Sequence, residues 1–188
     1  MSKEFKINEE EWKNRVNLSA CYHLADHFNM SDIIWNHISS KTSSIKDTFL
    51  INNFGLRYDE VTASNLLEVD LEGNIISGKG VINHTGFIIH GAIHKARKDI
   101  NCVMHTHSRA GLAISCLKDG LKPSIQDAAI FFNRVSYHDW QGMSTEDEEC
   151  DIIAKNLGKN NVMILRNHGL LTCGKSVGEA FMLMYYLD

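Results

Sequence analysis

Apolar positions along the chain repeat with two periods, which separate predicted helices from predicted strands. A period close to 3.6 residues predicts helices over 8–32, 85–99, 109–120 and 144–158, with a last helix after the capping pattern Ser176-x-x-Glu179. Short apolar or alternating runs predict strands over 47–53, 66–78 (a pair around a turn), 102–107, 133–139 and 162–169. Because helices and strands alternate loosely and one strand pair forms a hairpin, the pattern predicts an α/β fold with a mixed sheet.

The same pattern predicts one domain over residues 1–188. The sequence contains a single proline, and neither a Gly/Ser-rich linker nor an internal repeat interrupts it. The last predicted helix runs to Leu187 and Asp188 without a glycine or proline to end it, so we expect a chain that is shortened at its C-terminus.

Charge and cysteine content limit which binding partners and which cellular compartment we expect. Lys and Arg number 19 against 23 Asp and Glu, a formal net charge of −4, and no basic cluster stands out. Nucleic acid and anionic membranes are therefore not expected as partners. The five cysteines form no C-x-x-C pair, and the charged N-terminus lacks the apolar core of a secretory signal. We expect reduced thiols and a cytoplasmic protein.

Two histidines two residues apart raise the question of a metal site. His105 and His107 lie at the end of the apolar run CVMHTH. Alternate strand residues point to the same face, so the two imidazoles would project together, as a divalent metal requires. Two half-exposed strand histidines would give the same spacing. His168, in RNHG at the end of another apolar strand, is a candidate third ligand.

Four further histidines invite other interpretations. His90 and His94 have the helical i, i+4 spacing, which can bind a metal, but they lack the glutamate of H-E-x-x-H. This favours a helix flank with one ring satisfied by a hydrogen bond. His138 lies beside Asp139 and could act as an acid or base, or simply end a strand. His84 precedes a predicted helix and fits its cap region.

One stretch matches a nucleotide-binding motif by letter. GLLTCGKS, residues 169–176, has the form G-x-x-x-x-G-K-[ST] between a predicted strand and a predicted helix. Its four intervening residues are mostly apolar and typical of a strand, and only twelve residues follow Ser176. We interpret the match as chance.

Five stretches together resemble one known family. They are NHIS (36–39), FLINNFGLRYDEVTASNLLEVDLEGN (49–74), GFIIHGAIHKARKDINCVMHTHSRAGLAIS (86–115), YHDWQG (137–142) and ILRNHGLLTCGKSVGEAF (164–181). The chain is similar to the class II aldolase/adducin family, in particular to its adducin-like bacterial branch. The resemblance implies a three-layer α/β/α domain around a mixed, largely antiparallel sheet. It also implies a divalent metal, zinc before iron or manganese, held by His105, His107 and His168, and a homo-oligomer that is typically a ring-like tetramer.

The chain departs from the sugar-phosphate aldolases of that family at several positions. Their acid/base glutamate falls at or near Gly86, and no Asp or Glu lies between Lys79 and Asp99. We therefore consider His84 and His138 as replacement catalytic residues, since an imidazole titrates near neutral pH. Where the relatives bind phosphate this chain has Asn53-Phe54-Gly55 and Asn83-His84-Thr85.

These departures leave Asn36, Gly55 and Thr85 as candidate substrate-binding residues, and they favour a different head group on the substrate. A tyrosine that the neighbouring subunit supplies in those relatives falls near Gln126 or Asp127.

Two functions remain open from the sequence. The first is a divalent-metal-dependent, lyase-like enzyme that uses aldolase or related enolate chemistry on a small hydroxy- or keto-compound. The alternative is a non-catalytic, adducin-like structural or interaction domain that keeps a metal site, because the animal adducins use this fold as a structural module. Nucleotide hydrolysis through GLLTCGKS ranks last.

Overall fold

A computed structural model describes residues 7–43, 46–140 and 147–188, and its centre is one mixed sheet. The strands are β1 (His37–Lys41), β2 (Thr48–Ile51), β3 (Leu67–Asp70), β4 (Ile75–Ser77), β5 (Cys102–Thr106), β6 (Val135–His138), β7 (Val162–Leu165) and β8 (Gly169–Gly174). They lie in the order β4-β3-β2-β1-β5-β8-β7-β6. Within the described residues every neighbouring pair is antiparallel except β6 and β7, which are parallel. The largely antiparallel sheet is thus confirmed.

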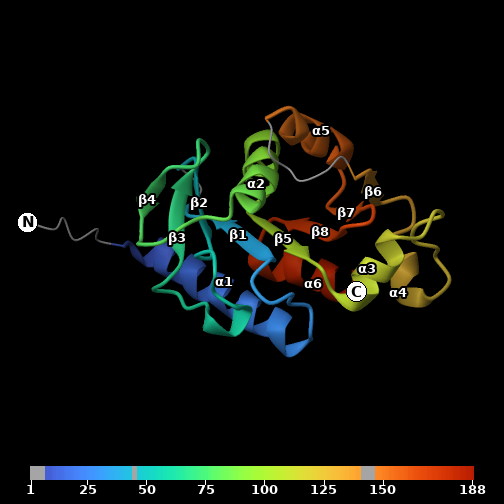
Figure 1. Cartoon of the computed structure of the whole chain (residues 1–188), viewed down its shortest axis with the longest axis horizontal. Helices are drawn as coiled ribbons and strands as arrows, with labels where there is room; N and C mark the ends of the chain where they lie inside the picture. Colours follow the sequence, from blue (N-terminus) through green and yellow to red (C-terminus); the bar gives the residue numbers. More distant parts are fainter. Residues whose placement is uncertain (1–6, 44–45, 141–146) are drawn as a thin grey trace, which may run out of the picture.

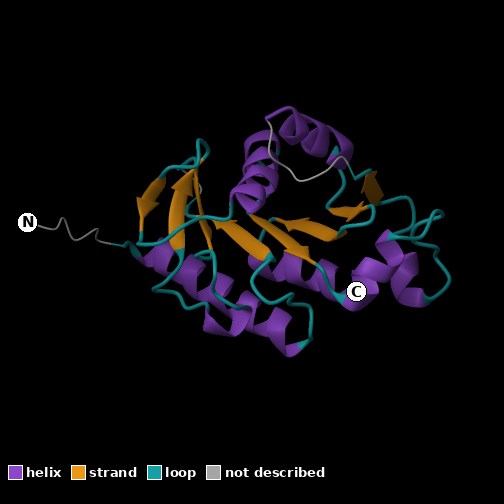
Figure 2. Cartoon of the chain, viewed as in Figure 1, coloured by secondary structure: helices purple, strands orange, loops and turns teal. Residues whose placement is uncertain are grey.

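Helices cover both faces of this sheet (Figure 1). They are α1 (Glu9–His27), α2 (His84–Ala96), α3 (Arg109–Ser115), α4 (Gln126–Ala129), α5 (Asp147–Leu157) and α6 (Val177–Leu187), and a 3-10 turn, η1, spans Tyr58–Glu60. α2 packs against α5 on one face, and α1 packs against α6 on the other (Figure 1). Figure 2 shows the strands between these two helical layers, which is the predicted three-layer arrangement.

Side chains of β5 point alternately to the two faces of the sheet, and both faces are apolar. Val103 belongs to the buried cluster under α2 and α5, and its neighbour Met104 belongs to the cluster under α1 and α6. Successive strand residues point to opposite faces, so a central strand of this kind needs apolar residues in both registers. Among the described residues, no helix is both long enough and apolar enough to cross a bilayer.

Several predicted boundaries differ from the structure. The first helix ends at His27, because Asn29 takes a left-handed φ of 58° that a helix cannot continue through. The helix predicted over 109–120 ends at Ser115, and the one predicted over 85–99 ends at Ala96. β1 and the short α4 were not predicted at all, and residues 144–146 of the predicted fourth helix lie outside the described residues.

The stretch that matches the nucleotide motif forms a strand and a helix cap. Gly169–Gly174 is β8, paired with β5. The Ser176 side chain accepts a hydrogen bond from the Glu179 amide, and the Glu179 carboxylate accepts one from the amide of Lys175 at 2.7 Å. A carboxylate therefore occupies the helix start where a phosphate would bind.

Candidate metal centre

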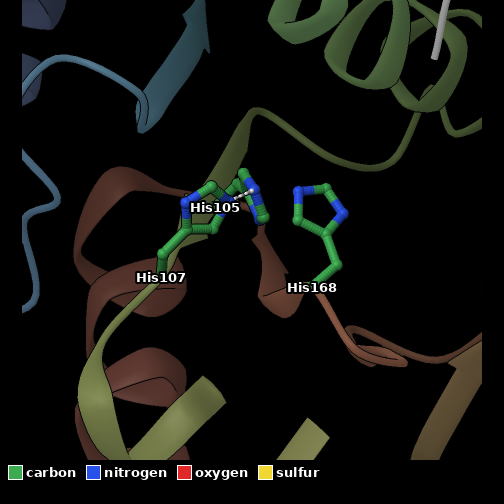
Figure 3. A group of neighbouring side chains, drawn as sticks. All are labelled: His105, His107 and His168. Carbon is green, nitrogen blue, oxygen red and sulfur yellow. Dashed lines mark hydrogen bonds between the residues drawn. The ribbon is translucent and has the colours of Figure 1, made fainter. Parts of the chain in front are cut away.

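Three histidine rings lie close together at the C-terminal end of the central strand β5 (Figure 3). His105 is the last residue but one of β5, His107 follows the strand directly, and His168 lies in the turn between β7 and β8. One nitrogen of each ring lies within 4.8 Å of one nitrogen of each of the others. The structure thus brings together the three predicted ligands.

A tight turn places His168 against β5. Gly169 has a φ of 154°, and a β-carbon built on it would lie 2.4 Å from the carbonyl oxygen of Thr106. Asn167 takes the left-handed φ of 58°, which Asn tolerates better than most residues. The turn after β7 can therefore approach β5 closely enough for His168 to reach the other two rings.

Hydrogen bonds at the Nδ1 atoms fix which nitrogens face the centre. His105 Nδ1 donates to the carbonyl oxygen of Leu170 at 2.8 Å, and His107 Nδ1 donates to a carboxylate oxygen of Asp32 at 3.0 Å. Since a carbonyl and a carboxylate only accept, both protons sit on Nδ1 and both Nε2 atoms carry lone pairs. These two Nε2 atoms are 2.9 Å apart (Figure 3). Two lone pairs directed at one place repel each other unless a cation lies there, so the donor set fits a divalent metal.

Burial keeps these rings in the form that binds metal. Burial lowers the pKa of His105 well below its usual value, and the neighbouring imidazoles His168, His107 and His37 lower it further. Burial and then the neighbouring His107 and His138 lower the pKa of His168 to about 4. Because only a neutral imidazole has a free lone pair, neither ring needs to lose a proton near neutral pH before it coordinates a metal.

A cavity of about 330 Å³ opens beside the three histidines. Its other lining residues are Asp32, Trp35, His37, Asn83, Thr85, Ile89 and Trp140. The volume suits a small molecule, and no lysine or arginine is among these lining residues. The surface that lines the cavity is mostly apolar.

The other predicted site residues lie at different distances from the cavity. Thr85 lines it, whereas the Asn36 side chain lies behind it and accepts a hydrogen bond from the His107 amide at 3.3 Å. Gly55 forms a turn with a φ of 96° and does not line it. His84 is the exposed first residue of α2, and His138 ends β6, where its Nδ1 lies 2.9 Å from the Asn156 side-chain amide. Neither of these two histidines lines the cavity, and their catalytic roles stay predictions.

Sequence reasoning missed His37, which lines the cavity from β1. Its ring centroid lies 5.1 Å from that of His105, and its Nδ1 lies 2.8 Å from Nε2 of His90. His90 Nδ1 is 2.6 Å from the Ser39 hydroxyl oxygen, which in turn is 2.8 Å from His94 Nε2. The rings predicted for a helix flank are thus fully buried and hydrogen-bonded. The histidine of NHIS carried no periodic signal, because β1 itself was not predicted.

His37 occupies the space beside Gly86, the position at or near which the aldolase relatives carry their glutamate. A β-carbon built on Gly86 would lie 2.5 Å from Cδ2 and 2.8 Å from Nε2 of His37. No side chain of any kind fits at residue 86 while His37 stays in place. Because the His37 imidazole fills this space, residue 86 has no room for a carboxylate side chain.

Comparison with known proteins agrees with the fold. Residues 16–188 match the family described as the class II aldolase and adducin N-terminal domain. Alpha-adducin of Rattus norvegicus is 46% identical over 177 residues, which cover 92% of this chain and 24% of the adducin.

Two solved structures resemble the whole chain. An aldolase II superfamily protein from Pseudomonas syringae has a TM-score of 0.95 and 43% identity, covering 100% of this chain and 76% of that one. An L-fuculose 1-phosphate aldolase from Glaciozyma antarctica has a TM-score of 0.86 and 29% identity, covering 100% of this chain and 74% of that one. Since the family profile spans nearly the whole chain, this protein belongs to the class II aldolase and adducin N-terminal domain family.

Proposed function

We propose that this chain is a divalent-metal-dependent, lyase-like enzyme that acts on a small hydroxy- or keto-compound through aldolase or related enolate chemistry. One observation carries the proposal: the Nε2 atoms of His105 and His107 lie 2.9 Å apart with both Nδ1 protons already committed, next to a cavity of about 330 Å³. His105, His107 and His168 would hold the metal, and zinc is the first candidate because it prefers imidazole ligands with one open position.

The chain's own residues prepare the centre for substrate. Leu170 and Asp32 hold the rings of His105 and His107 in one orientation, so little rotational freedom remains to be lost on binding. A divalent cation held by these residues would supply Lewis-acid stabilisation of negative charge that develops on a substrate oxygen. The side chains of Trp35, Ile89 and Trp140, which line the cavity, would exclude water from the metal centre.

Elemental analysis of the purified chain tests the metal. We expect about one zinc, iron or manganese per chain, with the metal lost in His168→Ala and retained in His27→Ala. His27 is exposed at the end of α1, so this control removes a histidine without touching the centre. Absence of stoichiometric metal after reconstitution with each of the three ions would contradict the proposal.

A screen of small hydroxy- and keto-acids, ketoses and their phosphates then tests the reaction. We expect turnover of at least one such compound by the metal-loaded chain and none by His168→Ala. Thr85→Ala, which alters the cavity wall without touching a ligand, should raise KM more than it lowers kcat.

The absence of an acidic residue at position 86 favours a second candidate, a non-catalytic adducin-like domain that keeps a structural metal. The likeness to alpha-adducin supports it. Both candidates predict bound metal, so the discriminating result is turnover. A chain that binds stoichiometric metal, unfolds at a lower temperature without it and turns over none of the screened compounds would favour the structural role.

Assembly into a homo-oligomer is part of the proposal. Large apolar side chains that are exposed in the isolated chain gather near α3 and α4, namely Leu117, Ile125, Ile130 and Phe132. Such residues suit burial between subunits. Light scattering should give a mass that is a multiple of 21.3 kDa, with a tetramer expected. A monomer at micromolar concentration would contradict this part.

A further inference from the structure

A buried chain of hydrogen bonds runs from the cavity into the space between β1 and α2. It joins His37, His90, Ser39 and His94, through contacts of 2.8, 2.6 and 2.8 Å. All four side chains are buried. The cavity end is His37 Nε2, which makes no hydrogen bond to the described residues. The far end is His94 Nδ1, which is buried and has no partner among them.

Such a chain has three consistent proton arrangements. A neutral imidazole carries one proton, so one of its nitrogens donates and the other accepts. In the first arrangement each ring is protonated on Nδ1: His37 donates to His90, His90 to Ser39, and the Ser39 hydroxyl to His94. In the second arrangement each ring is protonated on Nε2 and every bond runs in the opposite direction. In the third, His37 and His90 are protonated on Nδ1 and His94 on Nε2, so that His90 and His94 both donate to the Ser39 hydroxyl oxygen.

Buried donors left without an acceptor decide between them. The first arrangement would leave an N–H of His94 buried without an acceptor, whereas the second leaves only a bare nitrogen there. The third would leave the buried Ser39 hydroxyl proton without an acceptor among the described residues. Orphaned buried N–H groups are rarer in proteins than under-satisfied acceptors. In the second arrangement the unpaired N–H is on His37 Nε2. His37 lines the cavity, where a ligand can accept a hydrogen bond from this group.

We propose that His37 is a fixed hydrogen-bond donor of the site, presenting its Nε2–H to a substrate oxygen from the space that Gly86 leaves open. The inference rests on the proposed function and adds a residue to it. His90, Ser39 and His94 are positioning residues, because they fix the direction of the bonds and hold the ring against Gly86.

A neutral donor in this place stabilises negative charge that develops on the substrate oxygen. A preorganised N–H in a site with little water needs no reorientation during the reaction, which makes it effective in the transition state. The proposal transfers no proton to or from His37. The site would thus stabilise substrate charge with an uncharged imidazole, beside the position at or near which the resemblance implies a proton-transferring glutamate in relatives.

The proton arrangement can be read directly on the unmutated, metal-free chain. In two-dimensional ¹H–¹⁵N spectra of ¹⁵N-histidine-labelled protein, an imidazole protonated on Nε2 is distinguished from one protonated on Nδ1 by its nitrogen shifts and couplings. We expect His37, His90 and His94 all to be protonated on Nε2. His37→Phe assigns the His37 signals, or, if that variant does not fold, the contact of its ring with the Gly86 α-protons does. Protonation of His37 on Nδ1 would overturn the proposal.

Binding of acetohydroxamate to the zinc-loaded chain tests the donor role. This anion chelates metals through two oxygens and so places negative charge beside His37. We expect the Kd to rise roughly ten- to a hundred-fold in His37→Phe, which is typical of losing a hydrogen bond to a charged group, and to stay unchanged in His27→Phe. Zinc content should stay at the wild-type level in both variants.

The outcomes separate this inference from the proposed function. An unchanged Kd in His37→Phe with full zinc content would sink the donor role and leave the metal centre standing. Failure of the wild-type chain to bind zinc, iron or manganese would sink the proposed function, and with it the donor role. The tautomer spectra of the metal-free chain would then report only whether the bonds run in the inferred direction.

Discussion

Gly169 lies directly against the carbonyl oxygen of Thr106, with no room for a side chain between them. This contact joins the start of β8 to the end of β5, next to two of the three histidines. The position of His168 therefore depends on the presence of glycine at residue 169.

Gly169→Ala should therefore destabilise the fold and disturb the metal centre. An added β-carbon would lie 2.4 Å from the Thr106 oxygen, and the φ of 154° is one that L side chains rarely adopt. We expect a loss of more than about 2 kcal/mol in the free energy of unfolding, measured with urea, together with weaker zinc binding.

Gly178→Ala is the matched control for that substitution. Gly178 lies in the first turn of α6, where the nearest atom to an added β-carbon is 3.9 Å away. Alanine should leave stability unchanged or raise it by up to about 1 kcal/mol. Equal stability of the two variants would show that the approach of β8 to β5 is not tight.

Asp32→Ala should weaken metal binding without removing a ligand. Asp32 accepts the Nδ1 proton of His107 and so keeps its Nε2 lone pair on the centre. Loss of such a partner typically lowers metal affinity about 10- to 100-fold. Competition with a chelator measures the Kd for zinc, and Asp59→Ala, an exposed carboxylate paired with Arg57, is the control. The orienting role is wrong if Asp32→Ala and Asp59→Ala have the same affinity.

The buried histidines should make the metal-free chain sensitive to acid. Burial first, and then the positive charges of Lys41 and Lys98, lower the pKa of His94 to about 3. The unfolded chain, with a histidine pKa of about 6.5, binds this proton more readily than the folded chain does. Stability from this group is thus fully present above about pH 6.5 and is lost as the pH falls from there towards 3.

Urea unfolding at a series of pH values measures this loss. Each such group contributes a slope of up to about 1.4 kcal/mol per pH unit within that window. His94→Gln, which keeps a side chain able to bond to Ser39, should show a shallower slope than the wild type. An identical slope in the variant would mean that His94 is protonated equally easily in both states.

The chain should bind neither ATP nor GTP. Lys175 lies between β8 and the cap of α6, and the Glu179 carboxylate already accepts the hydrogen bond from its amide. Titration calorimetry with either nucleotide and Mg²⁺ should give no heat of binding. Millimolar or tighter binding that disappears in Lys175→Ala would reverse this interpretation.

The three-histidine group was accessible from sequence because its signals are local. HTH at the end of an apolar run, and RNHG after another, mark strand ends, and strand ends of one sheet tend to meet. The structure modifies one detail, since β5 ends at Thr106 and His107 lies beyond the strand. The hydrogen bonds that His105 and His107 donate to Leu170 and Asp32, more than strand alternation, turn both Nε2 atoms to the same place.

β1 could not be predicted in the same way, and His37 was missed with it. The strand HISSK has buried polar side chains, and α2 supplies the hydrogen-bond partners of two of them, His37 and Ser39. His90 lies far along the chain from His37, so no local period records the pairing. Sequence context indicated His84 and His138 as substitutes for the glutamate near Gly86. The space beside Gly86 is filled instead from a different strand.

The centre collects its parts from segments that are far apart along the chain: Asp32 after α1, His105 and His107 at β5, and His168 between β7 and β8. A peptide carrying HTH alone would lack the groups that turn its rings and the third ring that closes the set. Tight metal uptake therefore has to wait until the middle of the sheet is assembled. In a refolding experiment, the time course of zinc binding would report when the pairing of β5 with β8 is complete.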